Sequence, residues 1–179
     1  SYDTSLPLIK VNAETFNTLE PKLSLRFSPH EMKNNSDVSR RIDNTNVFAS
    51  NRLSLGNSFE AGESITLGFD FKKEKINTIN EIKKMEDYID FKLASVFRLR
   101  EEKNIPINST LNKKSSNIFG EFKFKPLDNV SLGYNFSLTD DLDKLEYSSL
   151  ITEMNYRNFN TKFEYLEETG VIGKTNIIA

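Results

Sequence analysis

Apolar side chains recur at every second position in several segments of this chain, each on the order of ten residues long. In the segment 130–138, Leu132 and Tyr134 alternate with Ser131 and Gly133. Successive side chains of a β-strand point to opposite faces, so this alternation predicts strands that have one apolar face and one polar face. The pattern therefore indicates an all-β chain.

The alternation also locates the predicted strands and their interruptions. Pro21 has no backbone N–H to donate to a sheet ladder, which indicates a bulge or a local break in the first full strand. Tyr147 and Leu150 differ in parity, which indicates a second bulge. Segment 47–55 fits either a short helix or a strand, whereas 73–86 is a charged connection whose apolar residues recur every three positions, as in a partial helix. Strands are expected at residues 17–28, 63–73, 87–99, 117–125, 130–138, 146–156 and 159–167, with parts of strands at 1–9 and after 173.

Tight turns and longer polar loops alternate between these strands. Outer-membrane barrels have short periplasmic turns and longer extracellular loops, so the alternation predicts two different ends of one barrel. The segment 29–62 is the longest loop and the best candidate for a cap or for a segment folded into the bore. The loop end is expected to carry 29–62, 100–116, 139–145 and 168–173, and the turn end 73–86, 126–129 and 157–158.

Two sets of side chains separate onto opposite faces of the predicted strands. The expected lipid-facing set is apolar: Phe69, Phe71, Phe91, Leu93, Phe122, Phe124, Leu132, Phe136 and Phe163. The expected lumen-facing set is charged: Glu20, Lys22, Arg26, Asp70, Asp90, Lys92, Arg98, Glu121, Lys123, Lys162 and Glu164. Unpaired charges are costly in a packed interior, so the second set favours a wide barrel with a hydrated bore. The prediction is an antiparallel transmembrane β-barrel domain, of which residues 1–179 form a partial arc of about eight strands.

Composition limits the function classes. The net charge is −2, which gives no support for nucleic-acid binding because that would require a strongly basic face. The longest apolar runs are very short, such as 47–49, whereas a transmembrane helix needs roughly 20 apolar residues. The chain has no cysteine, which excludes a disulfide framework and a cysteine metal site within it.

The sequence contains no recognisable catalytic constellation. His30 is the single histidine, and the seven glycines form no phosphate-binding loop. Asp140, Asp141 and Asp143 could offer oxygen ligands to a divalent cation, but their spacing lacks the EF-hand pattern and favours a solvated loop. We therefore expect a protein that is not an enzyme and has no cofactor and no bound metal.

Three stretches carry a resemblance to a known family. They are LEPKLSLRFSP at 19–29, the pieces RRIDN, NRL and FEAG within 40–62, and STLNKKSS followed by IFG within 109–120. These stretches resemble the C-terminal outer-membrane β-barrel domain of the LptD (OstA/Imp) family of lipopolysaccharide-assembly proteins, in its alphaproteobacterial form. The resemblance extends over nearly the whole chain.

The resemblance implies a location in the bacterial cell outer membrane and a role in lipopolysaccharide transport. In that family the barrel receives lipopolysaccharide from an LptA-like periplasmic bridge and releases it laterally into the outer leaflet, with an LptE-like plug lipoprotein inside. The implied partners are lipopolysaccharide, this plug, this bridge and outer-membrane lipids. The family's periplasmic jellyroll domain, which docks the bridge, has no counterpart in residues 1–179. The chain is therefore expected to be a fragment, and its open edges would favour aggregation if it were isolated.

Two alternatives remain open at the level of sequence. The strands also suit another outer-membrane barrel, such as a porin or a TonB-dependent receptor. They suit equally a soluble β-sandwich binding module, in which the apolar face packs on a second sheet. A requirement for detergent would separate both barrels from the sandwich, and loss of surface lipopolysaccharide on depletion would separate lipopolysaccharide assembly from the other barrel functions.

Overall fold

The computed structural model describes residues 1–56, 58–79 and 82–179. Within these ranges the chain forms ten strands and one short 3-10 helix. All ten strands belong to a single antiparallel sheet, which confirms the all-β prediction. The elements are β1 (Tyr2–Ser5), β2 (Leu8–Val11), β3 (Thr15–Ser28), β4 (Gly62–Ile79), β5 (Ile82–Arg98), η1 (Ile107–Ser109), β6 (Ile118–Leu127), β7 (Val130–Leu138), β8 (Leu145–Tyr156), β9 (Phe159–Glu168) and β10 (Thr175–Ile178).

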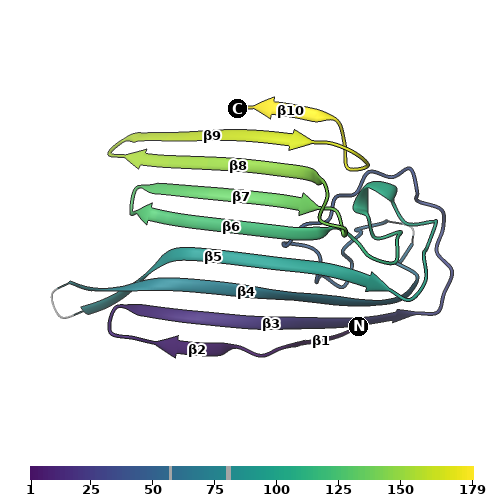
Figure 1. Cartoon of the computed structure of the whole chain (residues 1–179), viewed down its shortest axis with the longest axis horizontal. Coiled ribbons are helices and arrows are strands. Elements are labelled where there is room, and N and C mark those ends of the chain that lie inside the picture. Colours follow the sequence, from purple (N-terminus) through teal and green to yellow (C-terminus); the bar gives the residue numbers. More distant parts are fainter. Residues whose placement is uncertain (57, 80–81) are drawn as a thin grey trace.

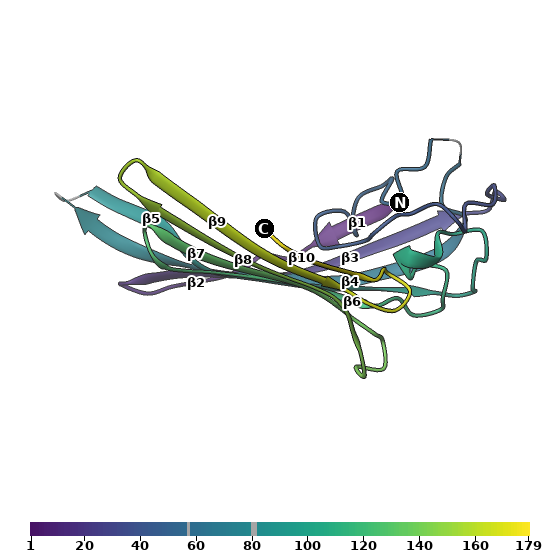
Figure 2. The same ribbon diagram turned by 90° about the horizontal axis from the view of Figure 1, so that it is seen from above.

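The strands lie side by side in chain order from β3 to β10, and β1 and β2 both pair with β3 at one edge (Figure 1). The seven full strands predicted from the alternation correspond to β3–β9. The sheet is curved and twisted, as Figure 2 shows, and it is not closed on itself in the described residues. The ten strands exceed the expected arc of about eight, and the partial strand predicted at 1–9 is divided into β1 and β2.

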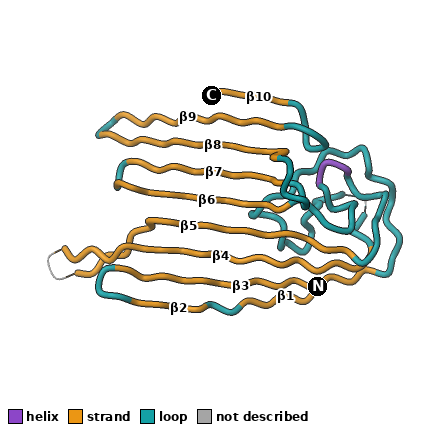
Figure 3. Tube along the Cα trace, in the orientation of Figure 1, coloured by secondary structure: helices purple, strands orange, loops and turns teal. Residues whose placement is uncertain are grey.

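The two ends of the sheet differ as the loop lengths predict. The long connections 29–61 and 99–117 and the shorter loops 139–144 and 169–174 lie together at one end, which we call the loop end (Figure 3). The opposite end, which we call the turn end, carries the connection between β6 and β7 and that between β8 and β9.

The prediction of a partly helical connection at 73–86 was wrong. β4 extends to Ile79 and β5 begins at Ile82, so these residues form a long hairpin; positions 80–81 of the prediction lie outside the described residues. The register shifts between Lys73 and Glu74, and Tyr88 is the extra residue on the partner strand. This bulge changes the parity of the side chains within β5, and the three-residue spacing of the apolar residues on both strands imitates a helix.

Pro21 does not cause the predicted bulge in β3. The pairing of β3 with β4 is continuous through Pro21 and Phe69. The carbonyl of Pro21 accepts a hydrogen bond from the Leu6 N–H at 3.2 Å, so its backbone faces the outer edge of the sheet. The interruption falls there instead, between β1 and β2 at Pro7, because the missing N–H of Pro21 affects only that ladder.

Two other interruptions differ in detail from the prediction. A register shift places Ser137 opposite Tyr147 and Leu138 opposite Leu145, so the bulge in β8 is at Glu146, at the start of the strand. Segment 47–55 is neither helix nor strand but a series of turns, because it packs on the sheet through isolated side chains and not through a repeating face.

The buried apolar cluster lies at the loop end, where the segments 29–61 and 99–117 join. Backbone hydrogen bonds connect them, from Asn35 N–H to the Asn104 carbonyl at 2.9 Å and from Ile107 N–H to the Ser36 carbonyl at 3.2 Å. We call these two segments the loop cap. Its buried side chains pack against three from the strands, and together they are Met32, Ile42, Val47, Leu53, Leu55, Ala61, Ile105 and Leu111 with Ala94, Val96 and Phe119.

Candidate functional site

The pairing register brings the eleven charged side chains of the predicted lumen-facing set onto one face of the sheet. Asp70 of β4 pairs with Glu20 of β3 and with Lys92 of β5, which in turn pairs with Glu121 of β6. Directly paired residues of antiparallel strands share a face, so the set continues across the sheet. The remaining members on this polar face are Lys22, Arg26, Asp90, Arg98, Lys123, Lys162 and Glu164.

The nine apolar side chains of the predicted lipid-facing set lie on the opposite face. Phe69, Phe91 and Phe122 form a row across three strands with edge-to-face rings, whose centroids are 5.7 and 6.5 Å apart. Phe122 and Phe163 are 37% and 44% exposed, and no second layer formed by the described residues covers this apolar face. The other members are Phe71, Leu93, Phe124, Leu132 and Phe136. That the apolar face contacts lipid and the polar face contacts water stays a prediction.

In the middle of the polar face, partly exposed lysine and aspartate side chains and the buried carboxylate of Glu121 form ion pairs. Lys22 Nζ lies 2.6 Å from Asp70 Oδ2. Glu121 Oε1 lies 3.1 Å from Lys92 Nζ and 2.8 Å from Lys123 Nζ. Ion pairs that solvent can reach contribute little to stability, so the partly exposed pair of Lys22 and Asp70 contributes little to holding the sheet together.

At the loop end, the polar face carries a buried cluster of three arginines around one carboxylate. Arg52 Nε donates to Glu60 Oε2 at 2.7 Å, and Arg52 Nη2 donates to Oε1 at 2.5 Å. Arg98 Nη1 donates to Oε1 at 2.5 Å, while Arg26 Nη1 lies 3.6 Å from Oε2. The Arg52 side chain is fully buried. We call these four residues the Glu60 cluster.

The Glu60 cluster ties the loop cap to the strands. Arg26 and Arg98 come from β3 and β5, whereas Arg52 and Glu60 come from the cap itself. Guanidinium groups present several donors in a fixed fork, which allows each to bridge two segments. The further bonds run from Arg26 to the carbonyls of Ala49 and Ser50, from Arg98 to the carbonyl of Ala61, and from Arg52 to the hydroxyls of Ser64 and Thr66.

The Glu60 carboxylate stays ionised in this environment. Burial by itself would raise its pKa, but the Arg52 hydrogen bonds and the positive charges of Arg52, Arg98 and Arg26 outweigh burial and lower the pKa below its usual value. Sequence reasoning identified Arg26 and Arg98 and missed Arg52 and Glu60. Those two lie in an irregular loop, where no periodic pattern distinguishes them from solvated charges.

Two further contacts hold the cap across the face. Gly68 of β4 leaves room for the Phe48 ring of the cap, since a Cβ at this position would lie 2.9 Å from it. Farther along the sheet, the Arg41 guanidinium lies 4.3 Å from the centre of the Tyr147 ring and 3.2 Å from Glu168 Oε1. The cap therefore extends from β3–β5 to β8–β9 over the loop end of the polar face.

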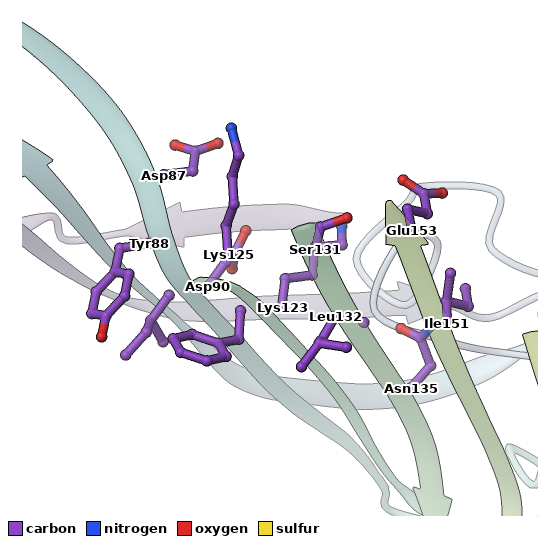
Figure 4. A pocket seen from close by; sticks show the side chains of 13 residues that line it. Asp87, Tyr88, Asp90, Lys123, Lys125, Ser131, Leu132, Asn135, Ile151 and Glu153 are labelled. Carbon is purple, nitrogen blue, oxygen red and sulfur yellow. The ribbon is translucent and has the colours of Figure 1, made fainter. Parts of the chain in front are cut away.

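A hollow lies at the turn end, where β5 separates from β6 and β7 (Figure 4). Its volume is about 280 Å³, and Asp90, Lys123, Ser131 and Glu153 line it together with the Tyr88 ring. Among the described residues, no group of histidine, cysteine and carboxylate side chains could hold a metal ion. Apolar side chains such as Phe124, Leu132 and Ile151 line this hollow beside the charges, and its side chains form no nucleophile–base pair.

No helix in the described part of the chain is long and apolar enough to cross a membrane. Comparison with protein families finds one family model, LptD, described as LPS transport system D, which matches residues 2–172. A search of curated proteins returns no match.

Proposed function

The chain belongs to the LptD family, the LPS transport system D proteins, and we propose that it forms part of the outer-membrane barrel through which lipopolysaccharide enters the outer leaflet. Membership indicates a role in lipopolysaccharide transport and assembly. We propose further that the barrel is closed, that it is inserted in the outer membrane and that it contacts other components of the transport system.

The observation that carries this proposal is the separation of the two sheet faces. One continuous sheet has charged side chains on one face and a bare apolar surface on the other. Water would make that apolar surface costly, whereas acyl chains would accept it. The second sheet that a soluble sandwich requires is absent from the described residues, and this favours the membrane.

The polar face would then line an aqueous bore. Its partly exposed charges suit a hydrated surface that passes or orients sugars and phosphates of lipopolysaccharide. The loop cap would close the outer end of this bore, since long loops lie on the extracellular side of such barrels. An LptE-like plug would contact the polar face, and an LptA-like bridge would deliver the lipid from the periplasm. The proposal includes no catalytic step and no cofactor.

Labelling of single cysteines tests the orientation of the two faces. Tyr134 and Asn135 are neighbours on β7 that point to opposite faces, and the chain has no cysteine of its own. In the protein as cells make it, a membrane-impermeant maleimide should label Asn135→Cys from the bore and leave Tyr134→Cys unmodified until the membrane is dissolved. Equal labelling of both variants in intact membranes would contradict a lipid-facing apolar surface.

Depletion of the protein tests the transport role. Loss of lipopolysaccharide from the cell surface, with accumulation of the lipid inside the envelope, is expected. Normal surface lipopolysaccharide together with correct membrane insertion would point to another barrel function, such as that of a porin or a TonB-dependent receptor.

A further inference from the structure

Lysine side chains gather on the apolar face at the turn end, where the apolar surface stops. Lys73 and Lys75 of β4 lie 5.8 and 3.8 Å from the centre of the Tyr88 ring. Lys10 of β2 pairs with Asn17, and Asn17 pairs with Lys73, so all three lysines belong to this face. We call them the rim lysines.

The rim lysines have no carboxylate within ion-pair distance among the described residues. Lys72, one position away but on the polar face, differs clearly because it pairs with Glu74 at 3.3 Å and with Asp87 at 2.7 Å. Two carboxylates lie near the rim lysines. Glu86 binds Lys84 and Asn77, whereas Glu14 lines a hollow together with Lys73 and Lys75 without an ion pair to either.

An apolar groove leads to these charges. Leu8, Leu19 and Phe71 line a hollow of about 390 Å³ together with Lys10. A neighbouring hollow of about 270 Å³ is lined by Lys73, Lys75 and the Tyr88 ring. The first hollow is thus mainly apolar, and the second, farther along the strands, carries unpaired positive charges. This order matches an amphiphile that has a hydrocarbon chain and an anionic headgroup.

We propose that the rim lysines and the groove beside them bind an anionic glycerophospholipid, with its phosphate between Lys73 and Lys75 and an acyl chain along Leu19 and Phe71. Ammonium groups act as point charges toward phosphate, and their alkyl stems lie along apolar surface. Tyrosine rings prefer the level of lipid headgroups. This inference rests on the proposed membrane insertion, which puts the turn end in the leaflet opposite the extracellular loops.

Native mass spectrometry of the protein extracted from outer membranes tests the site. The protein is titrated with phosphatidylglycerol, with phosphatidylcholine, with lipopolysaccharide and with inorganic phosphate. Each lysine near an anionic lipid contributes about fivefold, so Lys73→Gln/Lys75→Gln should weaken binding of phosphatidylglycerol on the order of 20-fold. Binding of phosphatidylcholine should not change, and Lys73→Arg/Lys75→Arg should retain most of the wild-type binding.

A matched control removes two positive charges elsewhere. Lys125 lies at the turn end in the hollow between β5 and β7, and Lys103 lies exposed in the loop cap. Lys103→Gln/Lys125→Gln should leave binding of phosphatidylglycerol unchanged. An equal loss in this control, or stronger binding of lipopolysaccharide than of phosphatidylglycerol at the rim lysines, would overturn the site. A protein that stays in solution without detergent and takes up no lipid would instead overturn the proposed function.

Discussion

Charged side chains of the polar face lie in two different environments. At the loop end, the Glu60 cluster is almost completely covered by the cap, whereas in the middle of the same face Lys22 and Asp70 each keep 27% of their side-chain surface exposed. A charge that protein covers must find its partners within the protein, because removal from water costs several kcal/mol per ion. A charge that water reaches can form and break its pairs at little cost.

This difference separates two roles of charge in the molecule. The Glu60 cluster fixes one particular conformation of the loop cap, since each arginine bonds to carbonyls or hydroxyls at specified positions. The partly exposed pairs in the middle of the face join neighbouring strands and leave a surface that other molecules can contact. Variants in the two regions should therefore differ strongly in effect, and the sizes of these effects test the comparison.

The largest effect is expected for Glu60→Gln. Loss of the carboxylate leaves three arginines buried without a counter-ion, which should destabilise the attached cap by about 3–5 kcal/mol. Limited proteolysis of whole outer membranes should then cleave within 29–61 much faster than in the wild type. Glu31→Gln removes an exposed carboxylate of the same cap and is the matched control, which should not change the rate of cleavage. Equal protease resistance in Glu60→Gln would show that the cluster does not hold the cap.

A pH titration of the wild type should reproduce the loss of cap stability that is expected for Glu60→Gln. The pKa of Glu60 is lowered in the folded protein, so its stabilisation is fully present above its usual pKa and disappears as pH falls through the lowered folded value. Cleavage within the cap should accordingly rise at acidic pH, and Glu60→Gln should abolish most of this pH dependence. A profile that is the same in both proteins would assign the acid sensitivity to other groups.

A smaller effect is expected when a charge is placed on the apolar face. Tyr134→Arg should destabilise the barrel by about 2–4 kcal/mol if this face meets acyl chains, as arginine does near the middle of a bilayer. Asn135→Arg, one residue away on the polar face, is the control and should cost less than about 1 kcal/mol. Urea unfolding in lipid vesicles measures both. Similar costs for the two variants would argue against a lipid-facing surface.

The smallest effect is expected for the exposed pair of Lys22 and Asp70. A double-mutant cycle of Lys22→Ala and Asp70→Ala should give a coupling energy below about 1 kcal/mol, and high salt should reduce it further. The same unfolding assay in vesicles measures the cycle. A coupling energy as large as the loss in Glu60→Gln would mean that water does not reach the middle of the polar face.

Local pattern was sufficient to predict most of the strands. A period of two residues specifies which side chains share a face, and seven of the observed strands follow from it. The pattern failed at 73–86 because the apolar residues there recur every three positions, which imitates a helix, although the backbone is extended. It failed at Pro21 because the consequence of a missing N–H depends on which neighbouring strand that N–H would face.

The candidate site was only half accessible to sequence reasoning. Arg26 and Arg98 were found because they lie at regular positions of strands, although their partner was not. Arg52 and Glu60 are separated by an irregular loop, and such loops carry no period that relates one side chain to another. The sequence identifies the rim lysines as charged residues, but it does not show that they share a face or that the Tyr88 ring lies beside them.

The sequence by itself determined the all-β class, the composition of the two faces and the difference between the two ends, because these depend on neighbours along the chain. Tertiary structure alone decided which charges are buried together, where the loop cap lies and which lysines are left without a carboxylate. Those properties depend on strand register and loop path, where a shift of a single residue moves a side chain to the other face.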